Sequence, residues 1–434
     1  MVEKNRVILT LDEMPRKWYN IAVDSPEPFP PYLNPANKEP MPPEPLMELF
    51  PKECVKQEAS QERYIDIPDE LLDIYMNYLG RPSPLCRAVR LEKYLNTPAE
   101  IYYKREDLSP PGSHKPNTAV AQAFYAKREG LETLTTETGA GQWGSALAYS
   151  CALFDLECKV FMVRISYEQK PLRKTIMKIY GADCVPSPSD TTESGKKFLE
   201  DEKNYNGSLG MAISEAIEMA MKDENAKYTL GSVLNYVLLH QTIVGEEVIK
   251  QFEKLDKTPD IMIGCVGGGS NFSGFVFPYL GKSIRKECKK IDIHAIEPTA
   301  CPSMSGGEYR YDFGDTAQTT PLIKMYTLGC DFVPPPIHAG GLRYHGAAPS
   351  TSSLAHQGLI DTFTYPQEDI FASAKLFAKV EGLIPAPETS HATHHAIMEA
   401  KKCKKTGEKK IIVFNHSGHG LMDLGGYRQI LNLE

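Results

Sequence analysis

The chain has 434 residues, of which 41% are apolar and 24% are charged, and its formal net charge is −8. This balance is typical of a globular protein with a large core, and the acidic charge argues against binding to nucleic acid or an anionic membrane. The ten cysteines form no CxxC pair, no apolar run approaches the roughly 20 residues of a membrane helix, and the N-terminus lacks a signal-peptide core, so we expect a soluble cytoplasmic protein without a disulfide framework.

The first expected element is a proline-rich arm. Residues 26–51 read PEPFPPYLNPANKEPMPPEPLMELFP, a density of proline that argues against a helix or an inner strand. Leu, Phe and Tyr are interspersed among the prolines. We therefore expect the arm to be extended and to dock on the body of its own chain, rather than to act as a ligand for another protein. We assign residues 1–75 to this arm.

From about residue 100 onward, strand and helix patterns alternate. Strands are expected at 99–107, 132–138, 158–165, 182–185, 260–266, 291–298 and 409–418. Helices are expected at 115–130, 141–154, 171–181 and 272–280. The first of these has Pro116 near its start and Gly130 just past its end. Repeated strand–helix units predict two parallel sheets covered by helices on both faces.

A lysine stands at the start of the first expected helix, in the segment GSHKPNT. By default Lys115 would extend its amine to solvent, but a positive charge there opposes the helix dipole. A lysine joined to a carbonyl as a Schiff base would explain the position. Pyridoxal 5′-phosphate is a small cofactor with both an aldehyde and a phosphate. In this interpretation Asn117 hydrogen-bonds the phenolic oxygen of the cofactor.

A second turn is the segment ETGAGQWG, Glu137 to Gly144, which leads from a strand into a helix. The free N–H groups of Thr138 to Gln142 could bind a carboxylate at the helix N-terminus. Glu137 lies at the mouth of this turn, where an acid could reach a bound substrate. The alternative for Glu137 is a solvated carboxylate at a strand end.

A third glycine turn, VGGGSN from Val266 to Asn271, follows the strand at 260–266. Glycines allow close approach of the backbone, and N–H groups at a helix start can converge on an anion. The segment lacks the spacing of GxxxxGK[ST] and of GxGxxG, so it fits the single phosphate of a small cofactor. The alternative is a tight structural turn.

Six segments carry a family resemblance: GSHKPNT, ETGAGQWG, GGGSN, HAGGLRYHG, EGLIPAPETSHA and HSGHG, in this order. Together they resemble the tryptophan synthase β chains, within the fold-type II pyridoxal-phosphate enzymes, over about residues 75–425. GQWG, GLRYHG and the long arm resemble the second, divergent class of these chains. The resemblance implies an α/β fold of two doubly wound domains with mostly parallel sheets and the cofactor between them. The implied domains are 76–245, with a mobile substrate-loop subdomain at about 130–220, and 246–434.

The resemblance also implies roles for individual residues. Lys115 matches the Schiff-base lysine and Glu137 the catalytic acid–base. The implied cofactor contacts are His114, Lys115, Asn117, Gly267, Gly268, Gly269, Ser270, Asn271, Glu388 and Ser417. The implied substrate-carboxylate loop is Thr138, Gly139, Ala140, Gly141 and Gln142. No metal ligands are assigned, because His391, His394 and His395 are interpreted as a helix face with His391 near the cofactor.

The implied reaction is a β-replacement that joins indole to serine or O-phosphoserine to give L-tryptophan. Ser417, opposite the pyridine nitrogen, would leave the ring uncharged and so favour loss of a β-leaving group over transamination. One alternative is another enzyme of this fold, a serine or threonine dehydratase, threonine synthase or cysteine synthase. Glu137 argues against these, because a carboxylate there suits indole. A scaffold without catalysis is opposed by the intact pair of Lys115 and Glu137.

Three positions depart from the family. Arg343 stands where the common β chains have an acidic residue beside the serine hydroxyl. Because arginine binds phosphate bidentately, we hypothesise that the donor is O-phosphoserine, with serine as a poorer substrate and with His345 assisting. The alternative is that Arg343 pairs with an internal carboxylate and serine remains the donor. Trp143 replaces a histidine and His419 an arginine.

The resemblance also bears on partners. Segments that dock the α subunit are not recognisable, so that subunit is interpreted as dispensable. A homodimer and a monovalent cation held by backbone carbonyls are family expectations.

Overall fold

The structure is a computed structural model that describes residues 5–433. Its largest sheet has the order β1 (Arg6–Val7), β4 (Leu85–Arg87), β5 (Glu100–Arg105), β15 (Ile411–His416), β10 (Ile261–Cys265), β11 (Asp292–Pro298) and β14 (Asp361–Tyr365). A second sheet has the order β8 (Asp183–Ser187), β7 (Glu157–Val163), β6 (Thr133–Thr138) and β9 (Ala226–Tyr228). Two antiparallel pairs are β2 (Lys17–Tyr19) with β3 (Tyr64–Asp66) and β12 (Glu308–Phe313) with β13 (Leu322–Thr327).

Helices cover these sheets. In the first half of the chain they are α1 (Glu44–Leu49), α2 (Lys52–Glu58), α3 (Asp69–Asn77), α4 (Val89–Leu95), α5 (Pro116–Glu129), α6 (Gln142–Leu153), α7 (Arg164–Gln169), α8 (Pro171–Ile179), α9 (Glu193–Leu199) and α10 (Leu209–Ala220). In the second half they are α11 (Asn235–Gln241), α12 (Ile243–Glu253), α13 (Ser270–Ile284), α14 (Ser303–Gly306), α15 (Pro349–His356), α16 (Gln367–Glu381), α17 (Pro387–Thr406) and α18 (Leu424–Ile430). Short 3-10 turns are η1 (Leu11–Glu13), η2 (Ile21–Val23), η3 (Glu202–Asn204) and η4 (Gly340–Leu342).

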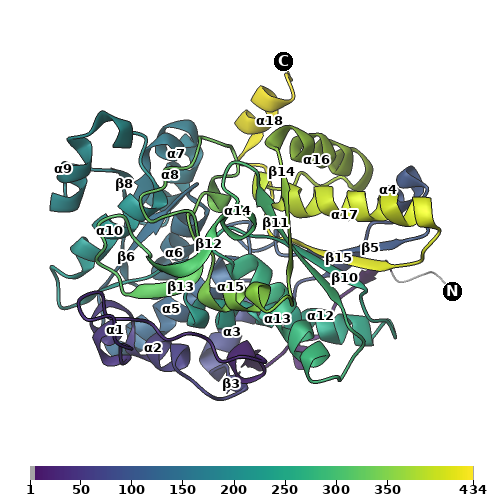
Figure 1. The fold of residues 1–434 in the computed structure, drawn as a ribbon, viewed down its shortest axis with the longest axis horizontal. Coiled ribbons are helices and arrows are strands. Elements are labelled where there is room, and N and C mark those ends of the chain that lie inside the picture. Colours follow the sequence, from purple (N-terminus) through teal and green to yellow (C-terminus); the bar gives the residue numbers. More distant parts are fainter. Residues whose placement is uncertain (1–4, 434) are drawn as a thin grey trace.

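The large sheet lies between two helix layers, as Figure 1 shows for α16 and α17 on one side and α12 and α13 on the other. Alternation along β5 explains why both faces are apolar. Ile101 and Tyr103 pack in the core cluster that contains residues of α17, whereas Tyr102 packs against Phe252 of α12. The pairs from β5 through β15, β10 and β11 to β14 are parallel, and so are all pairs of the small sheet. The expected doubly wound α/β fold with mostly parallel sheets is therefore confirmed.

The large sheet contains strands from both sides of the expected domain boundary between residues 245 and 246, and the domain bounds stay a prediction. Strand β5 precedes that boundary, yet it pairs in parallel with β15, with Ile101 opposite Ile412. The small sheet contains only strands between Thr133 and Tyr228, close to the expected subdomain at 130–220. The chain thus contributes β1, β4 and β5 to the large sheet, then forms the small sheet, and then adds β10, β11, β14 and β15 to the large sheet. A sequence pattern of strands and helices cannot reveal such a return, because pairing between distant strands leaves no local signal.

The arm docks on the body of its own chain, as expected, but it is not free of helix. Helix α1 begins at Glu44 after Pro43 and has Pro45 in its first turn. Proline is tolerated there because a first-turn N–H has no helical acceptor, so its absence costs no hydrogen bond. Leu46 and Phe50 join the largest apolar core cluster. The exclusion of helix from residues 26–51 was therefore wrong for Glu44–Leu49.

A buried charge network joins the arm side of the molecule to the large sheet. Glu247 of α12 accepts hydrogen bonds from Arg81 Nε at 2.9 Å and from Lys104 Nζ at 2.6 Å. Arg81 also pairs with Glu106 at 2.9 Å. All four side chains are buried, so two positive and two negative charges balance away from water.

We expect Glu247→Ala to lower the free energy of unfolding by about 3–5 kcal/mol, because it leaves Arg81 and Lys104 buried without their shared carboxylate. Glu253→Ala on the same helix is the matched control. Glu253 is exposed and pairs only loosely with Lys282, at 3.4 Å, so its loss should cost less than about 1 kcal/mol. Urea unfolding followed by circular dichroism measures both, and equal losses would contradict the assignment.

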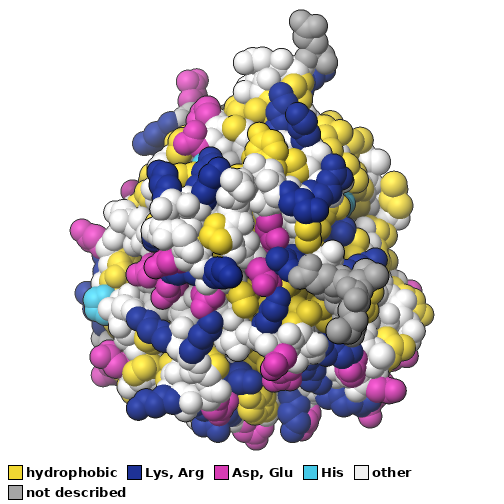
Figure 2. All heavy atoms as spheres, turned by 90° about the vertical axis from the view of Figure 1, so that its right-hand side faces the viewer, with side chains coloured by type: hydrophobic (Ala, Val, Ile, Leu, Met, Phe, Trp, Pro, Cys, Tyr) yellow, Lys and Arg dark blue, Asp and Glu magenta, His cyan; other side chains and the backbone are white. Residues whose placement is uncertain are grey.

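The face shown in Figure 2 carries mixed charge, with lysine and arginine side chains interspersed among aspartate, glutamate and uncharged groups. Within residues 5–433, no helix is long and apolar enough to cross a membrane.

Candidate active site

One cavity brings together residues from four distant parts of the chain. Lys115 precedes α5, Glu137 lies in β6, Gly268 precedes α13, and Tyr32 comes from the arm. The cavity walls are largely apolar and include Trp143. Three of the turns singled out in the sequence therefore open into the same space.

Lys115 is held at the start of α5 by the chain on both sides. Its own backbone is helical, and Pro116 fills the first helical position. The preceding residue, His114, donates its backbone N–H to the carbonyl of Ser417 at 2.9 Å. The Lys115 amine makes no hydrogen bond or ion pair with any described residue. Burial lowers its pKa, which increases the neutral fraction that can attack a carbonyl.

His114 and Ser417 form one wall beside this lysine. The Nδ1 atom of His114 lies 3.2 Å from the carbonyl oxygen of Ser417, and its Nε2 atom is buried without a partner among the described residues. Burial, together with the charge of Lys115, lowers the pKa of His114 to about 3, so its ring is neutral. The Ser417 hydroxyl lies 2.7 Å from the Thr389 hydroxyl. Ser417 thus offers an uncharged hydroxyl in this wall, and its expected place opposite the pyridine nitrogen stays a prediction.

The GGGSN turn is built for close approach. Gly269 has φ +108, and a Cβ atom on Gly267 would lie 2.6 Å from the carbonyl oxygen of Gly341. Helix α13 begins at Ser270, so its first N–H groups lack helical partners. One of these, the N–H of Ser270, donates to the Ser232 hydroxyl at 3.0 Å. The turn has the close backbone packing and helix start that a phosphate site needs.

Asn271 lies behind this turn rather than in the cavity wall. Its Nδ2 donates to the Cys265 carbonyl at 3.1 Å, and its Oδ1 accepts from Asn415 at 2.8 Å. The side chain therefore fastens the turn to β10 and β15.

Glu137 is buried, in contrast to the solvated alternative. Its carboxylate accepts a hydrogen bond of 2.5 Å from the Tyr228 hydroxyl. Burial raises the pKa of Glu137 to about 7, which is the value an acid–base group needs near neutral pH. Glu137 and Lys115 line the same cavity.

The TGAGQ turn joins β6 to α6. Gly141 has φ +88 and precedes the first residue of α6, Gln142. Thr138, Gly139, Ala140 and Gln142 line the cavity, and the first-turn N–H groups of α6 are free of helical partners. Glu388 supports the turn from behind, since it lies 3.4 Å from Gln142 Nε2 and accepts the N–H of Gly341 at 2.8 Å.

The Asn117 side chain is hydrogen-bonded within the protein. Its Nδ2 donates to both Glu106 and Gln241 at 3.0 Å, and its Oδ1 accepts from Arg81 at 2.8 Å. Both donors are thus used by the buried charge network, and the residue does not line the cavity. The role of Asn117 as a cofactor contact stays a prediction. The local spacing to Lys115 could not reveal these hydrogen bonds, because the partners are distant in sequence.

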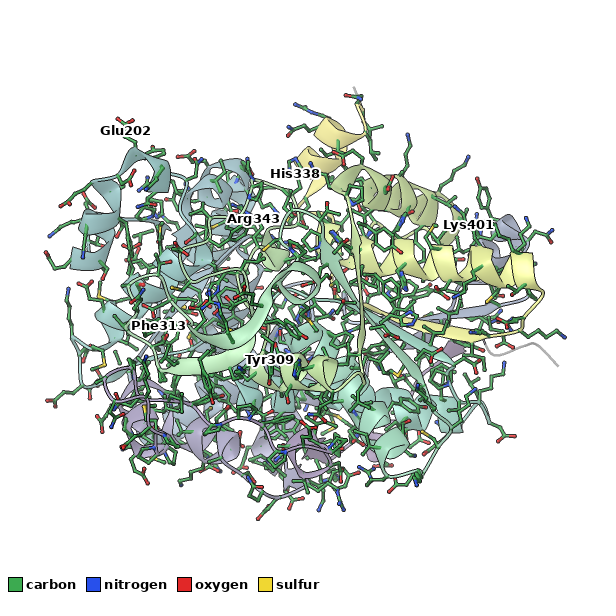
Figure 3. All side chains as sticks on the ribbon, viewed as in Figure 1. Glu202, Tyr309, Phe313, His338, Arg343 and Lys401 are labelled. Carbon is green, nitrogen blue, oxygen red and sulfur yellow. The ribbon has the colours of Figure 1, made fainter. Side chains whose placement is uncertain are left out.

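Arg343 follows η4 and is buried in the interior of the molecule (Figure 3). Its Nη2 donates to the Pro334 carbonyl at 3.2 Å, and it makes no ion pair with any described residue. The expected alternative of an internal carboxylate partner is therefore not what the structure contains. Arg343 lines a small cavity that shares Gly139 and Gly340 with the main one. His345 turns away, with its Nδ1 atom 3.0 Å from the Thr327 hydroxyl.

The histidines of α17 each have a separate partner. His391 Nδ1 lies 2.9 Å from the Pro387 carbonyl, and His394 Nδ1 lies 2.8 Å from the Ser373 hydroxyl. His395 Nε2 lies 2.9 Å from His294 Nδ1. The three side chains do not form a shared site.

The sequence patterns did not indicate several residues of the cavity wall. Tyr228 holds Glu137, Ser232 holds the GGGSN turn, and Tyr344 and Tyr32 line the cavity. Tyr228 ends a short strand, β9, and the residues after it contain the pair Gly231–Ser232, which was the available signal. Trp143, noted as a departure from the family, donates its indole N–H to Thr136 at 2.6 Å.

A family model and several named proteins match this chain. The family model described as pyridoxal-phosphate dependent enzyme matches residues 76–418. Proteins named tryptophan synthase beta chain 2 are similar over nearly the whole length. The protein from Methanothermobacter thermautotrophicus is 56% identical, covering 98% of this chain and 99% of its own. The protein from Aquifex aeolicus is 55% identical, covering 99% of both chains.

A solved structure shares the fold. The crystal structure of a fungal L-serine ammonia-lyase from Rhizomucor miehei aligns with a TM-score of 0.59 at 15% identity. It covers 80% of this chain and 97% of the ammonia-lyase. At this identity the likeness supports the fold alone.

Proposed function

Because this chain belongs to the pyridoxal-phosphate-dependent enzymes, as a tryptophan synthase β chain of the second class, we propose that it joins indole to the β-carbon of serine to form L-tryptophan. The observation that carries this proposal is that Lys115 and a buried Glu137 line the same largely apolar cavity. An acid–base group in an apolar space suits a planar aromatic substrate, whereas elimination to a keto acid needs no such space.

The residues present fit pyridoxal phosphate. The unpaired Lys115 amine would hold its aldehyde carbon, the GGGSN turn its phosphate, and the Ser417 hydroxyl its ring nitrogen. The partnerless Nε2 of His114 is a further polar group beside that lysine. When bound, the cofactor supplies an electron sink for the bonds at the substrate α-carbon.

The protein groups divide the proton transfers between them. Lys115, with its lowered pKa, takes the α-proton of the amino acid. The TGAGQ turn orients the amino-acid carboxylate through N–H groups at the start of α6. Glu137, with a pKa near neutrality, protonates the departing hydroxyl and then, as the carboxylate, accepts the indole N–H during attack by C3. The apolar wall excludes water that would otherwise divert the reaction to pyruvate.

A turnover assay with indole and serine, without any α subunit, tests the proposal. We expect tryptophan as the main product. Pyruvate alone would instead favour a dehydratase of the same fold.

Arg343 bears on which amino acid is the donor. Arg343 is a buried guanidinium without a carboxylate partner among the described residues, and its small cavity abuts the TGAGQ turn through Gly139. An unpaired buried cation costs free energy, and a phosphate is the group that arginine pairs with best. We therefore propose O-phosphoserine as a second donor beside serine.

We expect Arg343→Gln to lower kcat/KM for O-phosphoserine by about 10- to 100-fold and to leave kcat/KM for serine within about threefold. Arg310→Gln is the matched control, because Arg310 is partly exposed on β12 and pairs with Asp312. Steady-state kinetics with both donors measures the effect. If the wild type does not turn over O-phosphoserine, serine is the donor. If kcat/KM for O-phosphoserine is unchanged by Arg343→Gln, Arg343 does not bind the phosphate.

The remaining partner questions follow the family expectation. We infer a homodimer, and an activity that does not depend on an α subunit. Size-exclusion chromatography with light scattering, and turnover with and without an added α subunit, test these two points.

A further inference from the structure

The arm forms part of the active-site wall. Tyr32, Leu46, Leu49 and Phe50 all line the cavity that contains Lys115. Phe50 also packs on Tyr228, the residue that holds Glu137, with ring centroids 5.6 Å apart. The arm is therefore a component of the site and not only a surface attachment.

A second cavity, which we call the arm cavity, lies between the arm and the body. Phe29, Pro30, Tyr32, Met41 and Leu46 contribute apolar and aromatic surface to it. The rest of its wall mixes prolines and two alanines with polar groups, which are Glu58, Ser60, Gln61, Asn235 and Ser350. Tyr32 and Leu46 line both cavities, so these two side chains form the partition between them.

The partition has a fixed backbone on the arm side. Leu33 exchanges two backbone hydrogen bonds with Leu322 of β13, at 2.9 and 3.0 Å, and the Tyr32 carbonyl accepts the N–H of Met41 at 2.8 Å. The Tyr32 hydroxyl donates to the carboxylate of Glu58. Glu58 is held in turn by the N–H of Tyr236 at 2.7 Å. With the backbone tied, rotation of the Tyr32 side chain is the motion that would connect the two cavities.

The chemistry of the walls favours one of the two substrates. An amino acid is a zwitterion, and its passage through an apolar partition would require loss of its hydration. Indole is a planar, uncharged aromatic molecule with a single N–H donor. Proline and aromatic walls suit its faces, and the Glu58 carboxylate is an acceptor for its N–H.

We propose that the arm cavity is a binding vestibule for free indole and that Tyr32 is the gate through which indole reaches the catalytic cavity. This inference rests on the proposed function, because it assumes that indole is the second substrate. It gives the N-terminal arm a role in supplying the aromatic substrate directly from solvent.

The test uses Met41, which lines the arm cavity but not the catalytic one. Met41→Trp fills the vestibule and Met41→Ala widens it. In the holoenzyme mixed with serine, the rate of tryptophan formation at low indole concentration gives an apparent second-order rate constant for indole. We expect about a tenfold decrease in this constant for Met41→Trp and no decrease for Met41→Ala.

Pyruvate release from serine without indole is measured in parallel and should stay within twofold of the wild type for both variants. Met221→Trp, at an exposed methionine outside both cavities, is the matched control and should behave as the wild type. An unchanged indole constant in Met41→Trp would overturn the vestibule, and so would a loss of pyruvate release in either Met41 variant, since Met41 would then be structural. If the wild type releases pyruvate but never forms tryptophan, the proposed function itself fails.

Discussion

Lys115→Ala is expected to abolish covalent attachment of pyridoxal phosphate and to reduce tryptophan formation by at least about 10³-fold. The reason is that the Lys115 amine has two proposed roles. We propose that it holds the cofactor aldehyde and that it is also the base that takes the α-proton, because burial lowers its pKa. Borohydride reduction followed by peptide mass spectrometry should place the reduced cofactor on Lys115 in the wild type and on no lysine in the variant.

Two comparisons make this result specific. Lys127→Ala, an exposed lysine on the same helix, should retain both the labelled peptide and wild-type turnover. Lys104 is also buried, but it is already bound to Glu247 at 2.6 Å and to Gln251 at 3.0 Å, so it should not react. Recovery of the reduced cofactor on Lys104, or turnover by Lys115→Ala above one-thousandth of wild type, would contradict the assignment.

Local sequence patterns predicted the parts of the fold that local chemistry decides. Pro116 begins α5 because proline suits a first helical turn, and Gly130 follows its last residue because glycine suits the left-handed C-cap, where its φ is +86. The alternation of strand and helix predicted parallel sheets. Pairing of β5 with β15 could not be predicted, because these strands are some 300 residues apart and carry no shared signal.

Within the site as well, local sequence patterns predicted some residues, and tertiary packing alone placed others. Lys115, Glu137 and the GGGSN turn stand at strand ends and helix starts, where glycine and charge leave a recognisable pattern. Asn117 stands in the same pattern but points into the charge network, since Glu106 and Gln241 compete for its amide. Tyr32 and Tyr228 reach the cavity through tertiary packing, and a tyrosine alone in a sequence is typical of an ordinary core residue.

Glu137→Gln is expected to lower tryptophan formation from serine by about 10²–10⁴-fold while leaving exchange of the serine α-proton within a few-fold of wild type. The amide keeps the size of the side chain but cannot protonate the departing hydroxyl or accept the indole proton. Lys115 alone serves the α-proton, so deuterium exchange at the α-carbon, followed by NMR in heavy water, isolates its step. Loss of both activities together would mean that Glu137 supports the site structurally.

The pH dependence gives a sharper test, because the pKa of Glu137 is raised to about 7 by burial and lowered in part by the Tyr228 hydrogen bond. The indole step needs the carboxylate, so its rate should rise as the pH increases through about 7. The departure of hydroxyl needs the protonated acid, so the rate of that step should fall over the same range.

Tyr228→Phe removes the hydrogen bond that favours the carboxylate, so both the rising and the falling limb of the pH profile should move to higher pH. In Glu137→Gln both limbs should disappear near neutrality. A Tyr228→Phe profile that moved to lower pH would contradict the hydrogen-bond argument, and a Glu137→Gln profile that kept the wild-type limbs would assign the titrating proton to another group.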